Sequence, residues 1–72
     1  MTKRAVILLA EGFEEIEAIT PIDILRRAGI EVILAGINPQ DGCIQSARGV
    51  WVRVNKRIEE LPANFDACIL PG

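Results

Sequence analysis

Three glutamates near the start of the sequence are the side chains best suited to acid–base chemistry. Glu14, Glu15 and Glu17 open a stretch of helical character that reaches Ala28 and is closed by Gly29. A carboxyl group buried at the first turn of a helix has its pKa raised by desolvation and lowered by the helix N-terminus. Such a group can donate a hydrogen bond to an anion or act as a general acid or base.

The helical phase separates these three carboxylates. Glu17 precedes Ile24 by seven residues and Ala28 by eleven, and residues at these spacings share one helix face. Since that face carries apolar residues, we predict that Glu17 points inward, Glu14 lies at the edge of the face and Glu15 points away. The alternative is a solvated carboxylate that only interacts with the helix dipole; it stays open for Glu14 and Glu17 and is preferred for Glu15.

Two cysteines, an arginine and a tryptophan complete the candidate functional residues. Cys68 lies in an apolar run and is predicted to be an inert core thiol, whereas Cys43 lies beside a turn and is more accessible. Arg48 is either a solvated turn residue or a clamp for an anion or carboxylate, including one across a subunit boundary. Trp51 is either an interface anchor or a residue packed under a loop. Because the sequence has no histidine, it cannot form a Ser–His or Cys–His pair by itself.

Charge and composition exclude several classes of partner. The net charge is −2, with acidic and basic residues interspersed, so neither a nucleic-acid surface nor a polybasic membrane patch is predicted. Gly12 is a single glycine among acidic residues at the expected strand-to-helix turn, whereas a dinucleotide site needs a G-x-G-x-x-G turn. Two cysteines are too few for a metal knuckle or a disulfide scaffold. We therefore expect no cofactor and no metal.

The elements that must position these residues are those of a parallel α/β domain. Residues 5–10, 30–35 and 67–70 form short apolar runs that predict strands buried on both faces. A helix over residues 14–28, kinked at Pro21 with Thr20 capping its second half, joins the first two strands as a βαβ unit. Residues 43–46 and 50–54 predict a short antiparallel pair, and residues 58–61 at most one helical turn.

One helix cannot cover both faces of such a sheet. The residues expected to lie open on the other face are Val6, Leu8, Val32, Leu34 and Ile69. The segment Leu70-Pro71-Gly72 stands at the carboxyl end of a strand, where open α/β sheets place their ligand site. We therefore predict that residues 1–72 are the N-terminal part of a single domain, and that the remainder of the domain lies outside this sequence.

The N-terminus resembles a secretory signal only in its first residues. Met1 to Arg4 precede an apolar run that ends at Glu11, and this run is too short for a signal peptide or a bilayer-spanning helix. We interpret the run as a strand and expect a cytoplasmic protein without a membrane partner.

Six segments of the chain combine into a specific pattern, although each one alone is weak. They are Lys3-Arg4-Ala5-Val6-Ile7-Leu8-Leu9-Ala10, Gly12-x-Glu14-Glu15-x-Glu17, Pro21-x-Asp23, Arg26-Arg27-Ala28-Gly29-Ile30, Arg48 and Leu70-Pro71-Gly72. Together they cover essentially the whole chain and resemble the opening of the ThiJ/PfpI superfamily, nearest to its deglycase branch.

This resemblance implies a flavodoxin-like fold and a homodimer. Members carry a reactive cysteine on a strand-to-helix elbow, and a protonated glutamate hydrogen-bonds the cysteine thiolate; Glu17 matches this glutamate and is the expected catalytic residue. Glu14 matches an acidic residue of the substrate pocket, and Gly72 matches a glycine whose backbone helps to bind an anion. Arg48 matches an arginine that reaches the site from the partner subunit.

The resemblance also implies an activity. Activities attributed to the family include cofactor-independent glyoxalase and deglycase chemistry on small reactive carbonyls, redox sensing and chaperone-like holding. We expect an enzyme of the glyoxalase or deglycase type, with a non-enzymatic oxidative-stress sensor or holdase as the alternative. The family's nucleophilic cysteine lies beyond the position of Gly72, so these residues carry only part of the site. Ser46 stands where a close relative has a secondary cysteine.

Overall fold

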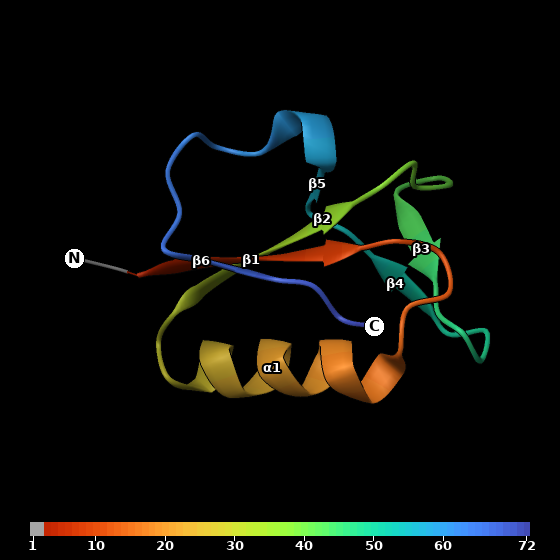
Figure 1. The fold of residues 1–72 in the computed structure, drawn as a ribbon, viewed down its shortest axis with the longest axis horizontal. Helices are drawn as coiled ribbons and strands as arrows, with labels where there is room; N and C mark the ends of the chain where they lie inside the picture. The colour runs from red at the N-terminus through yellow and green to blue at the C-terminus, as the bar shows by residue number, and fades with distance from the viewer. Residues whose placement is uncertain (1–2) are drawn as a thin grey trace.

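The centre of the structure is a parallel β-sheet with one helix packed against it (Figure 1). A computed structural model describes residues 3–72; Met1 and Thr2, which belong to the predicted basic start, lie outside the described residues. The sheet has the strand order β5-β2-β1-β6, with parallel neighbours throughout. The elements are β1 (Arg4–Leu9), α1 (Glu15–Arg27), β2 (Glu31–Gly36), β3 (Cys43–Gln45), β4 (Trp51–Arg53), β5 (Lys56–Arg57), the 3-10 turn η1 (Ile58–Glu60) and β6 (Ala67–Ile69).

The three apolar runs form strands of the central sheet, as predicted. Ile7 of β1 lies between Leu34 of β2 and Ile69 of β6. Val6 and Ile7 are fully buried although they point to opposite faces, so β1 needs apolar residues without alternation. Helix α1 connects β1 to its parallel neighbour β2, which confirms the predicted βαβ unit.

Helix α1 is closed by Gly29, which follows its C-cap Ala28, also as predicted. The amide of Ile30 donates to the carbonyl of Leu25 at 3.0 Å, and the amide of Gly29 donates to the carbonyl of Arg26 at 3.1 Å. Gly29 has a φ of +82°, a left-handed conformation that costs a residue without a Cβ little. This ending turns the chain back, so that β2 can begin at Glu31.

The predicted second cap at Thr20 is wrong. Helix α1 is continuous, and Glu14 is its N-cap. Pro21 has no amide hydrogen and removes one helical hydrogen bond, but Ala18 and Ile22 on either side of it are buried in the core. Tertiary packing on both sides therefore keeps the segment helical.

The inward face of α1 agrees only in part with the predicted face of Ile22, Ile24, Leu25 and Ala28. It consists of the buried Ala18 and Ile22 and the half-buried Leu25, at spacings of four and three residues. Ile24 is 57% exposed, and Ala28 is exposed. The helix carries two neighbouring apolar stripes, and the sheet packs against the stripe that contains Ala18.

The prediction that one face of the sheet lies open grouped residues from two different faces. The cluster on the helix side contains Ile7, Leu9, Val32 and Leu34, with Ile69 packed against it. The opposite cluster contains Val6, Ile33 and Ala35, with Leu8 and Leu61 packed against it. Leu61 directly follows η1 and packs against this second cluster. The segment after β5 therefore covers part of the face opposite α1 (Figure 1).

The middle of the chain forms the predicted antiparallel pair. Ile44 of β3 lies opposite Val52 of β4, and Ile44 is buried in the cluster on the helix side. The 3-10 turn over Ile58–Glu60 confirms the single helical turn. Strand β5 was not predicted, because its two exposed residues, Lys56 and Arg57, show no apolar pattern.

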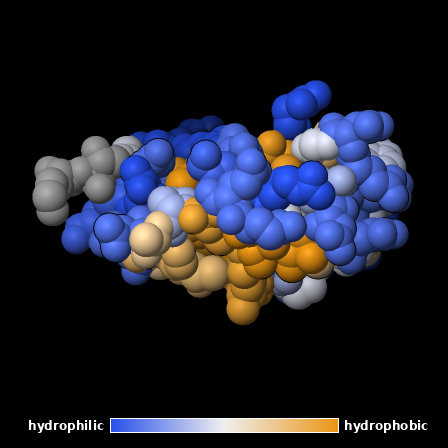
Figure 2. All heavy atoms as spheres, turned by 90° about the horizontal axis from the view of Figure 1, so that it is seen from above, coloured by the Kyte–Doolittle hydropathy of each residue, from blue (hydrophilic) through white to orange (hydrophobic). Residues whose placement is uncertain are grey.

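Apolar side chains still gather along one side of the surface (Figure 2). The large apolar residues that are at least half exposed are Ile16, Ile24, Val50, Trp51 and Leu70. Within residues 3–72, no helix has the length and apolar character needed to cross a bilayer.

Candidate functional site

The start of α1 and the end of the chain meet at the carboxyl edge of the sheet. The amide of Gly72 donates to Oε1 of Glu17 at 3.0 Å. In return, the carbonyl of Gly72 accepts from the amide of Glu14 at 2.7 Å. These two hydrogen bonds bring three of the predicted site residues together across most of the sequence.

A hollow with a volume of about 200 Å³ opens beside this junction. Its lining residues are Leu8, Ala10, Glu11, Gly12, Phe13, Ile37, Leu70, Pro71 and Gly72. They come from the end of β1, the turn before α1, the end of β2 and the segment after β6. This is the edge at which open α/β sheets bind ligands, as the sequence pattern predicted.

Glu17 is exposed, so the prediction that it points inward is wrong. The buried stripe of α1 runs through Ala18, and the Cα of Glu17 lies about 100° around the helix from it. Glu17 is held by its hydrogen bond to Gly72 rather than by burial against the sheet. Its proposed catalytic role stays a prediction.

Glu14 lies at the edge of the helix, as predicted, and both of its carboxylate oxygens are used. Oε1 accepts from the amide of Glu17 at 3.0 Å and caps the helix. Oε2 lies 2.6 Å from Nη2 of Arg48. The side chain of Glu14 is 31% exposed, so one edge of this carboxylate still faces solvent.

Glu15 makes more hydrogen bonds than the other two glutamates, although it was expected to be merely solvated. Oε2 accepts from Oγ of Ser46 at 2.5 Å and from the amide of Arg48 at 2.7 Å. Oε1 accepts from Nε and Nη2 of Arg48 at 3.0 and 2.7 Å. Glu15 does point away from the buried face of α1, but the turn between β3 and β4 lies on that side and leaves its side chain only 16% exposed.

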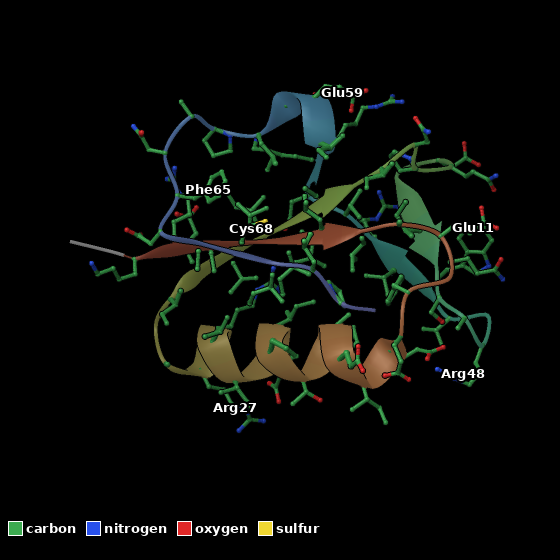
Figure 3. The ribbon with its side chains drawn as sticks, viewed as in Figure 1. Glu11, Arg27, Arg48, Glu59, Phe65 and Cys68 are labelled. Carbon is green, nitrogen blue, oxygen red and sulfur yellow. The ribbon has the colours of Figure 1, made fainter. Side chains whose placement is uncertain are left out.

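These contacts keep both partners charged. The hydroxyl of Ser46, followed by the backbone of the helix start and Arg48, lowers the pKa of Glu15 from 4.5 to about 2, against a smaller opposing effect of desolvation. The hydrogen bond and the charge of Glu15 raise the pKa of Arg48 above its ordinary value. The arginine is thus bound to two carboxylates of its own chain (Figure 3). Its predicted role in a partner subunit stays a prediction.

The β3–β4 hairpin is also attached to the turn that leads into α1. The amide of Gly12 donates to the carbonyl of Gln45, and the amide of Ala47 donates to the carbonyl of Phe13, both at 2.9 Å. Phe13 and Ser46 form a parallel bridge. The sequence did not predict the contact between Ser46 and Glu15, because these residues are 31 positions apart and no periodic signal pairs a helix start with a hairpin turn.

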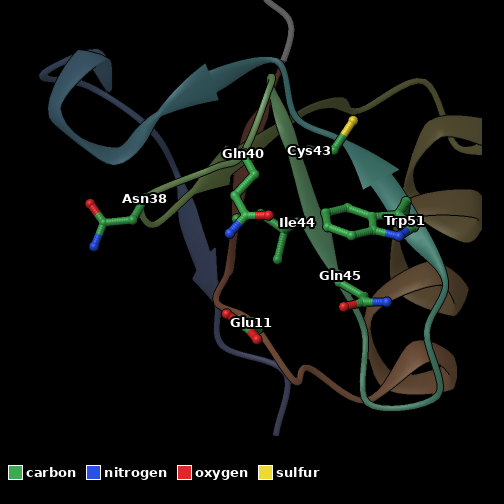
Figure 4. A pocket seen from close by; sticks show the side chains of 7 residues that line it. All are labelled: Glu11, Asn38, Gln40, Cys43, Ile44, Gln45 and Trp51. Carbon is green, nitrogen blue, oxygen red and sulfur yellow. The ribbon is translucent and has the colours of Figure 1, made fainter.

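Neither cysteine lines the hollow beside Gly72. Cys68 is exposed, which contradicts its prediction as a core thiol, because β6 is an edge strand and the side chain leaves the sheet on the face opposite α1 (Figure 3). Cys43 is half-buried. It borders a smaller hollow of about 30 Å³ together with Trp51, which is 52% exposed (Figure 4). Among the described residues, no three His, Cys, Asp or Glu side chains gather as a metal site would require.

Comparison with known proteins places these features in a family. The profile described as the DJ-1/PfpI family matches residues 3–72. The Parkinson disease protein 7 homolog of Danio rerio is 38% identical over 72 residues, which are 97% of this chain and 38% of that protein. Protein/nucleic acid deglycase 2 of Escherichia coli is 40% identical over 75 residues, covering 100% of this chain and 42% of the relative.

The fold agrees with solved structures over the same length. The crystal structure of Drosophila melanogaster DJ-1beta superposes with a TM-score of 0.92 at 38% identity and covers 100% of this chain and 39% of that one. The predicted flavodoxin-like α/β fold is thereby confirmed. The chain spans about two fifths of the length of these relatives.

Proposed function

This chain belongs to the DJ-1/PfpI family, and on that premise we propose that it forms one wall of a cysteine-dependent site that acts on small reactive carbonyls, as glyoxalases and deglycases do. The observation that carries the proposal is the hydrogen bond between Glu17 and Gly72 beside the hollow at the carboxyl edge of the sheet. The deglycase names of several relatives support the same class of substrate.

The reaction starts with a thiolate that the family's pattern puts beyond Gly72. The thiolate sulfur bonds to the aldehyde carbon of the substrate, the π bond of the carbonyl breaks, and its electron pair moves to the oxygen. Glu17, which matches the protonated glutamate of the family, holds the thiolate before the attack and supplies the proton that this oxygen takes up. The scheme assigns no role to Cys43 or Cys68, and neither one lines the hollow.

The remaining site residues bind and orient the substrate. The amide of Gly72 holds Glu17 in place, and the positive end of the helix dipole at the start of α1 favours a developing negative charge on oxygen. Glu14 holds the first turn of the helix in place through its cap. Arg48 balances the charges of Glu14 and Glu15, so that the pair does not add two negative charges beside this oxygen. A homodimer and a cytoplasmic location complete the proposal.

The test uses the purified gene product that carries this chain, with methylglyoxal as the substrate. We expect turnover, and we expect Glu17→Ala to lower kcat about 100-fold or more. Asp23→Asn is the matched control, because it removes an exposed carboxylate from the same helix that pairs with Arg27; its kcat should match that of the wild type.

Two outcomes would overturn the proposal. Wild-type turnover in Glu17→Ala would remove Glu17 from the mechanism. A wild-type protein that does not consume methylglyoxal or an early glycation adduct, but oxidises one low-pKa thiol at low peroxide concentrations, would instead be the oxidative-stress sensor.

A further inference from the structure

We propose that Glu15 is the positioning residue of this site. It binds the β3–β4 hairpin to the first turn of α1 and thereby sets where Glu17 and Gly72 meet. The effect on turnover rests on the proposed function, but the geometry can be measured without any activity.

Glu15 helps to hold the turn of the β3–β4 hairpin against the rest of the molecule. β3 and β4 form a sheet of their own, separate from the central one. Their turn reaches the rest of the molecule through the backbone bonds to Gly12 and Phe13 and through the carboxylate of Glu15. Four hydrogen bonds end on this one carboxylate, which is the full capacity of its two oxygens.

The hydroxyl that donates to Glu15 belongs to Ser46, a buried residue that is only 5% exposed. It accepts from the amide of Val50 at 2.9 Å and donates its single proton to Glu15. Because both capacities are in use, the hydroxyl has one orientation, and the carboxylate of Glu15 is held by a donor that cannot rotate away at low cost.

Arg48 and Glu14 connect Glu15 to the contact between Glu17 and Gly72. Nη2 of Arg48 lies 2.7 Å from Oε1 of Glu15 and 2.6 Å from Oε2 of Glu14. Glu14 caps the helix with its other oxygen, and its amide donates to the carbonyl of Gly72. A continuous series of contacts therefore runs from the hairpin turn through the glutamate pair to Gly72, whose amide binds Glu17.

Arg48 could not hold this position through Glu14 alone. Its side chain is 64% exposed, and an exposed pair with one carboxylate contributes little. Glu15 accepts from Nε and Nη2 of the guanidinium with one oxygen and from the arginine's own amide with the other, and these bonds fix both ends of the residue. Loss of the charge on Glu15 should thus release Arg48 from Glu14 as well.

The experiment compares Glu15→Gln with wild type in the gene product that carries this chain, using amide NMR signals and their hydrogen exchange. We expect the amides of Gly72 and Glu17 to shift and to exchange faster, while the amide of Ile7 in the central strand stays unchanged. Asp23→Asn is again the control, since it removes a carboxylate from α1 that does not touch the hairpin. If Glu15→Gln does not fold, Ser46→Ala removes the hydroxyl that binds Glu15, and the same shifts are expected.

Kinetics separate the inference from the proposed function. In an active protein, Glu15→Gln should lower kcat about 10-fold and leave KM within about two-fold, because the substrate still binds while the reacting groups are misplaced. Unchanged signals of Gly72 and Glu17 in Glu15→Gln would overturn the positioning role, whatever the activity. An inactive wild-type protein with the expected shifts would overturn the proposed function and leave the geometric inference intact.

Discussion

The amide of Gly72 donates to the carboxylate of Glu17 at 3.0 Å, across 55 residues of sequence. This contact joins the segment after β6 to the first turn of α1, two elements that are not neighbours in the chain. It places a carboxylate and a backbone donor side by side at the edge of the sheet where a ligand would enter.

Gly72→Ala tests how much this contact matters. A Cβ at position 72 would lie 3.0 Å from Oε1 of Glu17, so the carboxylate has to move. Because that oxygen ends a flexible side chain, we expect the free energy of unfolding to change by less than about 1 kcal/mol. Turnover of methylglyoxal should fall about 10-fold, measured as kcat, because the displaced carboxylate no longer faces the reacting oxygen.

Gly29→Ala is the matched control for that variant. Position 29 has a φ of +82° and no neighbouring atom within 4 Å, so the added methyl group strains only the backbone. Unfolding in urea should show a loss of about 1–2 kcal/mol with unchanged kcat. Wild-type kcat in Gly72→Ala would show that the Glu17–Gly72 contact has no part in catalysis.

The pH dependence of stability should report on Glu15. The pKa of Glu15 is about 2 in the folded state, chiefly because the hydroxyl of Ser46 donates a hydrogen bond to the carboxylate. The ordinary pKa of a glutamate is 4.5. A lowered folded-state pKa stabilises the protein fully above pH 4.5, and this stabilisation is lost as the pH falls towards 2. The other charged groups that face this carboxylate are Arg48, which stays charged throughout, and Glu14.

Thermal melts between pH 7 and pH 2 provide the measurement. The midpoint of Glu15→Gln should lie below that of the wild type at neutral pH, and the two should converge as the pH falls through this window. Asp23→Asn, which lacks an exposed pair on the same helix, should follow the wild-type curve. Parallel curves for Glu15→Gln and wild type would contradict the assignment.

Gly36→Ala should destabilise the attachment of the hairpin to β2. A Cβ at this buried position would approach Ile44 Cγ1 and both Val54 methyl carbons to 3.1 Å. Since these side chains are packed in or against the core, we expect a loss of about 1–3 kcal/mol in urea unfolding. The double variant Gly36→Ala with Val54→Ala provides the check, because alanine at position 54 lacks both of the crowded methyl carbons. It should cost less than the sum of the two single changes, and simple additivity would contradict the crowding.

Local sequence patterns predicted correctly those features that depend on a single element. Three apolar runs without alternation predicted three parallel strands, and Gly29 followed by Ile30 predicted the end of the helix. The same kind of reasoning failed for the second cap at Thr20, because it weighed one lost hydrogen bond without the packing of Ala18 and Ile22. It also failed for Cys68, because composition does not tell an edge strand from a central one.

The sequence alone therefore determined the elements other than β5, the family pattern and the edge of the sheet at which Glu14, Glu17 and Gly72 gather. Only the tertiary structure decided what each carboxylate contacts. Helical phase correctly turned Glu15 away from the sheet, but it could not reveal that Ser46 and Arg48 lie on that side. The physical reason is that periodicity describes one element at a time, whereas a hydrogen bond between a helix start and a hairpin turn depends on how two elements pack.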